Sequence, residues 1–473
     1  MARTPRREVI DESTVGVFHC VNRCVRRAFL CGQDPVSGQD FDHRRAWIQR
    51  RMEFLAGEFG VEVLGFAVMS NHLHVILRTR PDVVNRQRGQ PDFGDQRGLV
   101  SQSLGGPSLA PHRGLRRPVM ARTPRREVID ESSVGVFHCV NRCVRRAFLC
   151  GQDPVSGQDF DHRRAWIQRR MEFLAGEFGV EVLGFAVMSN HLHVILRTRP
   201  DVVAEWSDND IALRWWNLFP LRREQDGSPA EPTEAELGML LCDSKVLAER
   251  RQRLSSLSWF MRWLAEPIAR RANKEDECTG RFWEGRYKCQ PLLDEAALLA
   301  CSVYVDLNPV RAGIAATPET SRHTSGYERI EASKVEIGTI RHSDTPNPEQ
   351  APRQDDWLSP IELDKQSERS TTRSARRASD RGYLSLDLTA YLKLLDWTGR
   401  QIRRGKRGSI PSDLALILER LQISADLWVN TVQNFRKLFH RAAGSPTTLA
   451  AEAARRGKRW LAGMQTSREC FAG

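Results

Sequence analysis

The segment HLHVILR places two histidines, His191 and His193, on either side of Leu192. The run is apolar and short, which predicts a β-strand, and residues two apart in a strand share a face. Both imidazoles then point to one side of the strand and Leu192 to the other. Two neutral imidazoles on one face can bind a single divalent cation, although the same spacing also fits two histidines with no common role.

A tyrosine and an asparagine follow with helical spacing. DEAALLACSVYVDL, residues 294–307, predicts a helix, and Tyr304 and Asn308 lie on one side of its end. Asn308 precedes Pro309, which disfavours a further helical turn. A phenol beside a bound metal can attack a phosphodiester, because the metal polarises the phosphate and stabilises charge in the transition state. The amide oxygen of Asn308 could complete the metal site, whereas the alternative is that Tyr304 is a half-buried core residue.

The elements that must position these residues are readable in the same region. VGVFHCV (134–140), VEVLGFAV (180–187) and HLHVILR (191–197) predict strands, and the last two form a hairpin across a short polar turn. Apolar residues at helical spacing predict helices over 161–178 and 254–274. A short strand within FWEGRYKCQPLL is expected before the tyrosine helix.

Three strings, VMSNHLHVIL, FWEGRYKCQPLL and YVDLNPVRAG, occur in this order. Together they closely resemble the single-tyrosine HUH transposases, and more specifically the insertion-sequence-200-like group that includes the REP-associated tyrosine transposases. The resemblance covers residues 134–203 and 254–315. It implies a ferredoxin-like α+β sandwich in which the histidine hairpin belongs to an antiparallel sheet and the tyrosine helix packs across it. It also implies a catalytic Tyr304 and a divalent metal, Mg²⁺ or Mn²⁺, with the ligands His191, His193 and Asn308.

The activity that this resemblance implies is DNA-strand transfer in DNA transposition and recombination. Tyr304 would attack single-stranded or hairpin DNA, keep a 5′-phosphotyrosine link and release a 3′-hydroxyl that can later be rejoined. The covalent link conserves the bond energy, and the chain has no P-loop for a nucleoside triphosphate. Three alternatives stay open: a host-retained nuclease that acts on hairpin DNA, a DNA-binding or repressor protein without mobility, and a metal-dependent hydrolase that uses water.

The N-terminal part of the chain is duplicated. Residues 1–84 reappear as residues 120–203 with one difference, Thr14 against Ser133. Residues 85–119, between the copies, are rich in Gly, Arg, Gln and Pro and predict a flexible linker. The first copy retains His72 and His74 but has no tyrosine helix, so we expect it to be inactive and redundant.

The chain is basic, with 71 Lys and Arg against 59 Asp and Glu and a formal net charge of +12, which suits a polyanionic partner. Basic and aromatic residues alternate in the segment RFWEGRYK, an arrangement that suits a single strand through phosphate contacts and base stacking. The alternative is that its aromatic rings are core. The predicted DNA-binding residues are Arg281, Trp283, Arg286, Tyr287 and Lys288, together with Arg403 and Arg404 in the run GRQIRRGKRG.

The chain of 473 residues is long enough for more than one domain. We expect a catalytic domain over 120–315 with an insertion near 204–253, a disordered connector over 316–382, and a helical, basic accessory domain over 383–473. No apolar run is long enough to span a membrane and no secretory signal is visible, so we expect a cytoplasmic, nucleoid-associated protein. A homodimer is possible through exchange of the duplicated part.

Overall fold

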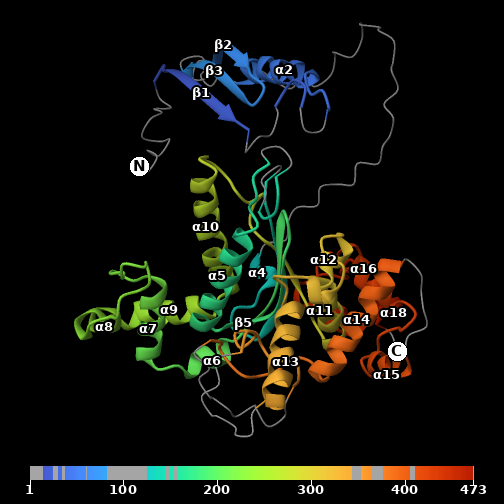
Figure 1. Cartoon of the computed structure of the whole chain (residues 1–473). Coiled ribbons are helices and arrows are strands. Elements are labelled where there is room, and N and C mark those ends of the chain that lie inside the picture. The colour runs from blue at the N-terminus through green and yellow to red at the C-terminus, as the bar shows by residue number, and fades with distance from the viewer. Residues whose placement is uncertain are drawn as a thin grey trace. The chain divides into compact units, whose positions relative to one another are not determined.

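The structure is a computed structural model (Figure 1). It describes residues 14–24, 30–34, 38–59, 61–81, 125–144, 149–153, 157–342, 353–363, 376–404 and 411–471. These residues belong to two compact units, Met1–Arg122 and Thr123–Gly473, each with its own sheet. The expected linker at 85–119 lies outside the described residues.

The larger unit contains a four-stranded antiparallel sheet in the order β5-β6-β4-β7. Its strands are β4 (Gly135–Arg142), β5 (Val180–Val187), β6 (His191–Thr198) and β7 (Lys288–Pro291). Along the chain, α5 (Arg163–Glu177) follows β4 and α10 (Leu257–Glu275) precedes β7. The two helices pack against each other. This βαββαβ order, with the first strand between the third and the last, is the ferredoxin-like arrangement. The predicted α+β fold with an antiparallel sheet is therefore confirmed.

The sheet is buried on both faces. Along β6, Leu192 and Val194 join the core that contains α5 and α10, whereas Ile195 joins a second core on the opposite face. The second core is built around α11 (Glu295–Asp306), which packs against β5 and β6. The helix begins where the side chain of Asp294 accepts a hydrogen bond from the backbone N–H of Ala297, at 3.0 Å. The sequence thus directs alternate residues of one strand into two different cores.

Helices account for most of the remaining described residues of the larger unit. The insertion before α10 is helical, and so is the region after 383, as predicted for the C-terminal part. That region belongs to the same compact unit as the sheet, and α16 packs against α11. The remaining elements are α4 (Arg125–Val128), α6 (Pro200–Glu205), α7 (Asp208–Leu218), α8 (Glu234–Leu241), α9 (Ser244–Ser255), α12 (Asn308–Arg311), η1 (Pro318–Thr320), α13 (Ser325–His342), α14 (Leu388–Arg404), α15 (Ser412–Arg420), α16 (Trp428–Leu438), α17 (Pro446–Arg455) and α18 (Met464–Cys470).

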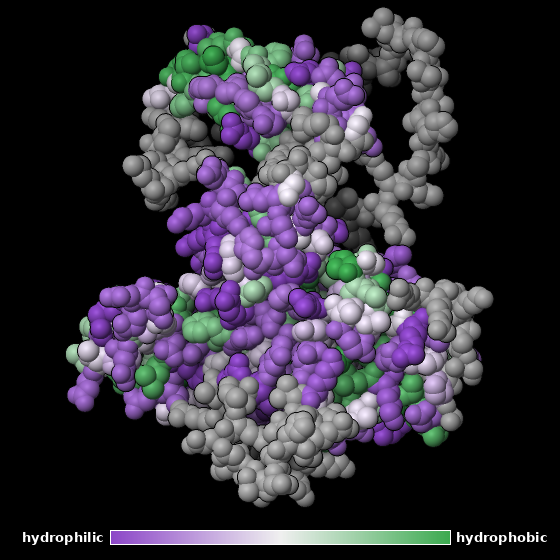
Figure 2. Space-filling view, viewed as in Figure 1, coloured by the Kyte–Doolittle hydropathy of each residue, from purple (hydrophilic) through white to green (hydrophobic). Residues whose placement is uncertain are grey.

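The smaller unit repeats the beginning of this fold. It has β1 (Val17–Arg23), α2 (His43–Glu58), β2 (Val61–Val68) and β3 (His72–Thr79), with the sheet order β1-β3-β2. The described part of this unit has no counterpart of β7, α10 or α11. Several of its large apolar side chains are exposed, and Figure 2 shows hydrophobic side chains gathered on its surface. The local structure therefore forms without the layers that cover it in the second copy.

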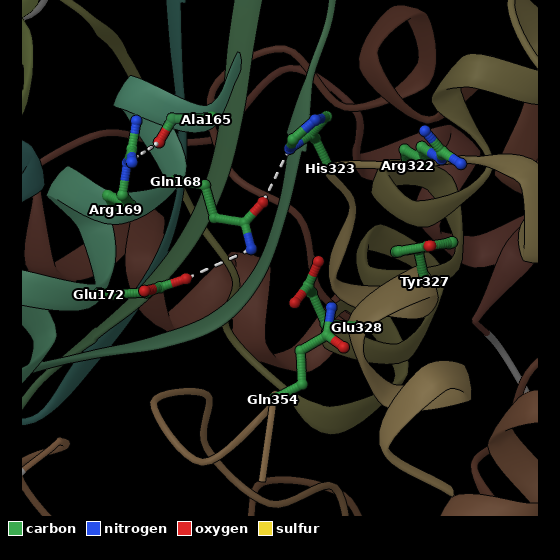
Figure 3. A pocket seen from close by; sticks show the side chains of 9 residues that line it. All are labelled: Ala165, Gln168, Arg169, Glu172, Arg322, His323, Tyr327, Glu328 and Gln354. Atoms are coloured by element: carbon green, nitrogen blue, oxygen red, sulfur yellow. Dashed lines mark hydrogen bonds between the residues drawn. The ribbon is translucent and has the colours of Figure 1, made fainter. Parts of the chain in front are cut away.

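Part of the expected connector is folded. Helix α13 starts beside the edge strand β5, where the backbone N–H of Val187 donates to the carbonyl of His323. Between α5 and α13 lies a cavity of about 390 Å³ into which Glu328 projects (Figure 3). Burial raises the pKa of Glu328 to about 7. The prediction of a disordered connector over 316–382 is thus wrong for this segment, whose polar side chains line a cavity.

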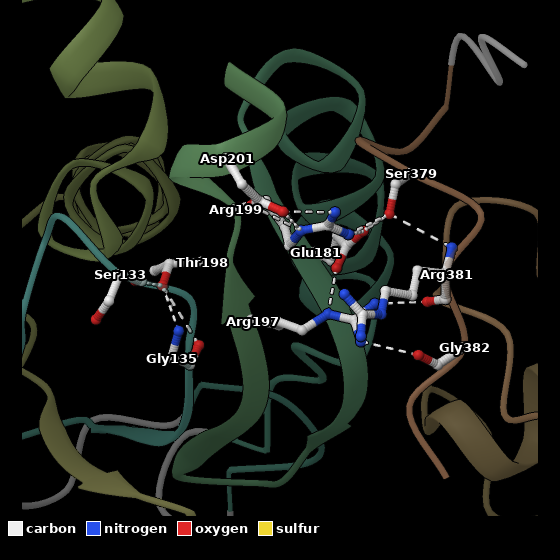
Figure 4. A network of polar contacts seen from close by, with 10 residues as sticks. All are labelled: Ser133, Gly135, Glu181, Arg197, Thr198, Arg199, Asp201, Ser379, Arg381 and Gly382. Atoms are coloured by element: carbon white, nitrogen blue, oxygen red, sulfur yellow. Dashed lines mark hydrogen bonds and ion pairs between the residues drawn. The ribbon is translucent and has the colours of Figure 1, made fainter. Parts of the chain in front are cut away.

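A buried ionic network holds a later part of the same segment (Figure 4). The Glu181 side chain has no exposed surface and pairs with Arg197 and Arg199. Arg197 also donates to the carbonyl of Gly382, at 2.9 Å, and Ser379 bonds Glu181. The side chain of Trp357, from the described stretch 353–363, is fully buried. The polar composition of residues 316–382 predicted disorder, because composition alone does not show which polar side chains find partners inside the fold.

Candidate active site

The histidine hairpin lies in the sheet beneath α11. On β6, His193 pairs with Val140 of β4 in the antiparallel register, and His191 pairs with Arg142. The rings of His191 and His193 are 4.8 Å apart between centroids, on the same face as Ile195. Leu192 is buried on the other face. The strand therefore presents both imidazoles toward the tyrosine helix.

Helix α11 brings Tyr304 to these histidines. Its ring centroid lies 5.6 Å from that of His193 and 5.9 Å from that of His138, edge to face in both cases. Only 5% of Tyr304 is exposed. The apolar run of α11 is buried from Ala296 to Asp306, and this burial fixes the position of the tyrosine. Residues far apart in the sequence thus meet at one point on the sheet.

A line of polar side chains crosses the sheet behind His193. Gln290 of β7 donates through Nε2 to the carbonyl of Phe439, so its Oε1 is left as an acceptor, 3.4 Å from Nδ1 of His138. A neutral His138 that donates from Nδ1 must accept at Nε2, which is 2.8 Å from Nδ1 of His193. His193 then donates from Nδ1 and keeps the lone pair on Nε2. The chain of bonds selects the tautomer of the buried imidazole.

The two hairpin imidazoles are suited to bind a metal. Nε2 of His193 is buried without a hydrogen-bond partner. Nδ1 of His191 is 2.6 Å from the side-chain oxygen of Asn190, an arrangement that leaves Nε2 of His191 as its ligating atom. Burial is the main cause that lowers the pKa of His191 to about 4 and that of His193 well below its usual value. Both rings are therefore neutral at physiological pH, as metal coordination requires.

Asn308 lies at the start of α12 and is buried, with 7% of its surface exposed. Its Oδ1 accepts from Arg311 at 3.4 Å, and its Nδ2 is buried without a partner. Among the described residues, no group of three or more His, Cys, Asp or Glu side chains could hold a metal ion. A metal would thus rest on two imidazoles and an amide, and Asn308 stays a predicted ligand.

Sequence reasoning missed several residues of this site. The guanidinium carbon of Arg311 lies 4.6 Å from the Tyr304 ring centroid. Arg436 of α16 is close enough to lower the pKa of His138, second only to the effect of burial, and that pKa falls to about 3. His138 interrupts the apolar strand VGVFHCV, which was the available signal, and Arg311 lies within YVDLNPVRAG. Gln290 and Arg436 carry no local signal, because only the tertiary fold brings them here.

The predicted DNA-binding segment separates into two kinds of residue. Tyr287 is 8% exposed, and the indole nitrogen of Trp283 donates to the carbonyl of Ala265 in α10 at 2.8 Å. The stacking role predicted for Tyr287 is therefore wrong, because its ring packs in the core. Arg281, Arg286 and Lys288 are exposed and stay predicted phosphate contacts.

The other predicted residues add little to the site. Arg403 and Arg404 end α14, and their side chains lie outside the described residues. In the smaller unit, His72 and His74 repeat the hairpin geometry, with ring centroids 4.7 Å apart. The described residues of that unit include no tyrosine beside them.

No protein-family model matches the chain, and no curated protein matches it. The chain is similar to a solved REP-associated tyrosine transposase bound to a REP hairpin, with 9% identity and a TM-score of 0.24, over 42% of this chain and 79% of the other. In the described part of the chain no helix could cross a membrane. The function must therefore be argued from the geometry of this chain.

Proposed function

We propose that the chain cleaves and rejoins single-stranded or hairpin DNA through a phosphotyrosine at Tyr304, as a transposase-like strand transferase. The observation that carries the proposal is the meeting of Tyr304 with His193, whose ring centroids are 5.6 Å apart. His193 is fully buried and its Nε2 has no partner. An unsatisfied buried nitrogen costs stability, about 1–3 kcal/mol, unless a ligand uses it.

A divalent metal, Mg²⁺ or Mn²⁺, fits these residues. His191 and His193 would hold it through Nε2, and Asn308 would add its amide oxygen after a rotation of the amide. When bound, such an ion polarises the attacked phosphate and stabilises its developing charge. The hydrogen bonds that His191 and His193 donate to Asn190 and His138 keep both imidazoles oriented.

The reaction would be a transesterification. The Tyr304 oxygen forms a bond to phosphorus as the bond from phosphorus to the 3′ oxygen breaks, and the 5′ strand end stays on the tyrosine. The phenol gives up one proton and the leaving 3′ oxygen takes one up, so no net proton is consumed. Attack by another 3′-hydroxyl reverses the step. Arg311, stacked over the tyrosine ring, holds the ring in place and places positive charge near the attacked phosphate.

A covalent-adduct assay tests the proposal directly. The full chain is incubated with end-labelled hairpin and single-stranded DNA and Mn²⁺ or Mg²⁺, and protein–DNA bands are resolved under denaturing conditions. We expect an adduct and a cut strand with the natural chain. Tyr304→Phe removes one oxygen and should lower both by at least about a thousandfold while DNA binding stays near normal. Cleavage that persists in Tyr304→Phe would mean that water, not the tyrosine, is the nucleophile.

If the natural chain binds hairpin DNA but forms neither adduct nor product, the binding or repressor alternative replaces strand transfer. Mobility is a separate question, because a host-retained nuclease would use the same chemistry. Products rejoined to a second DNA end would distinguish strand transfer from simple nicking.

A further inference from the structure

A cavity of about 200 Å³ lies beside the tyrosine, between the β4–β7 edge of the sheet and the end of α16. It is large enough to hold several waters or one phosphate group. Two of its lining side chains, Lys288 and Arg436, are basic. It is lined by His138, Val140, Lys288, Cys289, Gln290, Arg436, Phe439 and His440, and none of these carries a carboxylate.

The electrostatics of the cavity favour an anion. Lys288 and Arg436 each carry a full positive charge. Phe439 is fully buried, so its face is closed to a stacking base. The cavity therefore suits a charged backbone group better than a nucleobase.

The cavity adjoins the proposed nucleophile. His138 forms one of its walls and also lies 5.9 Å from the Tyr304 ring, centroid to centroid. Phe435, the residue before Arg436, lies 5.8 Å from the same ring. The carbonyl of Phe439 accepts from Gln290, which ties the end of α16 to β7. A ligand in the cavity would thus be a close neighbour of a phosphate attacked by Tyr304.

We infer that this cavity is a subsite for one DNA backbone phosphate next to the phosphate that Tyr304 attacks, with Arg436 and Lys288 as its donors. The inference rests on the proposed function. It gives helix α16, in the C-terminal region, a direct part in holding the DNA strand. The smaller unit has counterparts of His138 and Val140 in His19 and Val21, but its described residues include no strand like β7 and no helix like α16.

Charge removal at single DNA positions tests the subsite. Binding is measured with full-length Tyr304→Phe, which cannot cut, on hairpin DNA in which one phosphate at a time is replaced by a neutral methylphosphonate. We expect one position next to the cleavage site to weaken binding about tenfold, as loss of a charge-assisted hydrogen bond does. Adding Arg436→Gln should weaken binding of unmodified DNA to a similar extent and remove the penalty at that one position. The salt dependence should lose about one ion equivalent.

Lys437→Gln is the matched control, because Lys437 is the next residue on α16, is exposed and does not line the cavity. It should keep the full penalty at the sensitive position. Lys288→Gln should also remove the penalty at the sensitive position, because Lys288 lines the cavity from β7. The inference is overturned if no position is sensitive, if Arg436→Gln keeps the penalty, or if Lys437→Gln abolishes it equally.

The outcomes separate this inference from the proposed function. A sensitive phosphate that depends on Arg436, together with no covalent adduct in the natural chain, supports a phosphate-binding site at Arg436 and removes the strand-transfer proposal. A normal adduct with no effect of Arg436→Gln on binding supports strand transfer and removes the subsite.

Discussion

The two copies of the N-terminal sequence fold alike but are buried very differently. In both copies the hairpin has the same register. Both copies also have the same histidine contact: His19 Nε2 lies 2.9 Å from His74 Nδ1, and His138 Nε2 lies 2.8 Å from His193 Nδ1. The local sequence therefore determines the strands and the histidine geometry. The rest of the chain determines how deeply these strands and histidines are buried.

Apolar side chains show the difference most clearly. Leu64, Phe66 and Ile76 are 42–46% exposed, whereas their equivalents Leu183, Phe185 and Ile195 are completely buried. Full burial of one such side chain contributes about 1.5–3 kcal/mol. The smaller unit lacks several such contributions, which is a large part of the stability of a small domain. Helices α10 and α11 and strand β7 thus turn a local motif into a stable, enclosed site.

The largest expected difference between the copies is catalytic. His191→Ala and His193→Ala should each lower DNA cleavage by at least about a hundredfold, because each removes one of few metal ligands. The matched changes His72→Ala and His74→Ala should leave cleavage within about twofold, since no tyrosine helix accompanies them. Cleavage rates on labelled hairpin DNA provide the measurement. Larger losses from the first-copy changes would show that the active copy has been assigned wrongly.

Much of the fold could be predicted from the sequence, because it depends on local patterns. The strands of the hairpin and the tyrosine helix follow from alternation and from helical spacing. The connector could not, since its later part is held by contacts between distant segments, such as the hydrogen bond from Arg197 to the carbonyl of Gly382. Within the site, His191, His193 and Tyr304 were predicted from motifs and the structure brings them together. Gln290 and Arg436 were missed because neither belongs to a pattern in its own segment.

The second expected difference concerns stability. Glu181 is buried between two arginines, whereas its equivalent Glu62 pairs with Arg78 and Arg80 while 39% of its side chain is exposed. Removing one partner of a buried pair costs about 3–5 kcal/mol, against about 0–1 kcal/mol for a surface pair. Glu181→Gln should therefore lower the free energy of unfolding of the larger unit far more than Glu62→Gln lowers that of the smaller unit. Chemical denaturation of the two variants compares them, and equal losses would contradict the difference in burial.

A smaller effect is expected from the residues behind His193. Gln290→Leu removes the acceptor that orients His138, and we expect it to weaken Mn²⁺ binding about 10–100-fold, the usual range for a residue that orients a metal ligand. Calorimetric titration with Mn²⁺ measures this affinity in the absence of DNA. Gln290→Glu keeps an acceptor and should restore part of the affinity.

The matched control is His19→Asn against His138→Asn. Only the change at His138 should alter Mn²⁺ affinity if the bound metal lies in the second copy. Unchanged affinity in both Gln290→Leu and His138→Asn would show that the hydrogen-bonded line does not support the ligand.

The smallest effect on activity is expected from removing the first copy altogether. Deleting residues 1–119 removes the exposed side chains of Leu64, Phe66 and Ile76 and leaves the larger unit with its sheet and tyrosine helix. Exposed apolar surface promotes association, so the shortened chain should be more uniform by light scattering and should bind less hydrophobic dye. Its cleavage rate should stay within about twofold of that of the full chain, because the described residues of the smaller unit supply no nucleophile. A shortened chain that folds but loses cleavage would show that the first copy contributes to DNA processing, and the two copies would then have complementary roles.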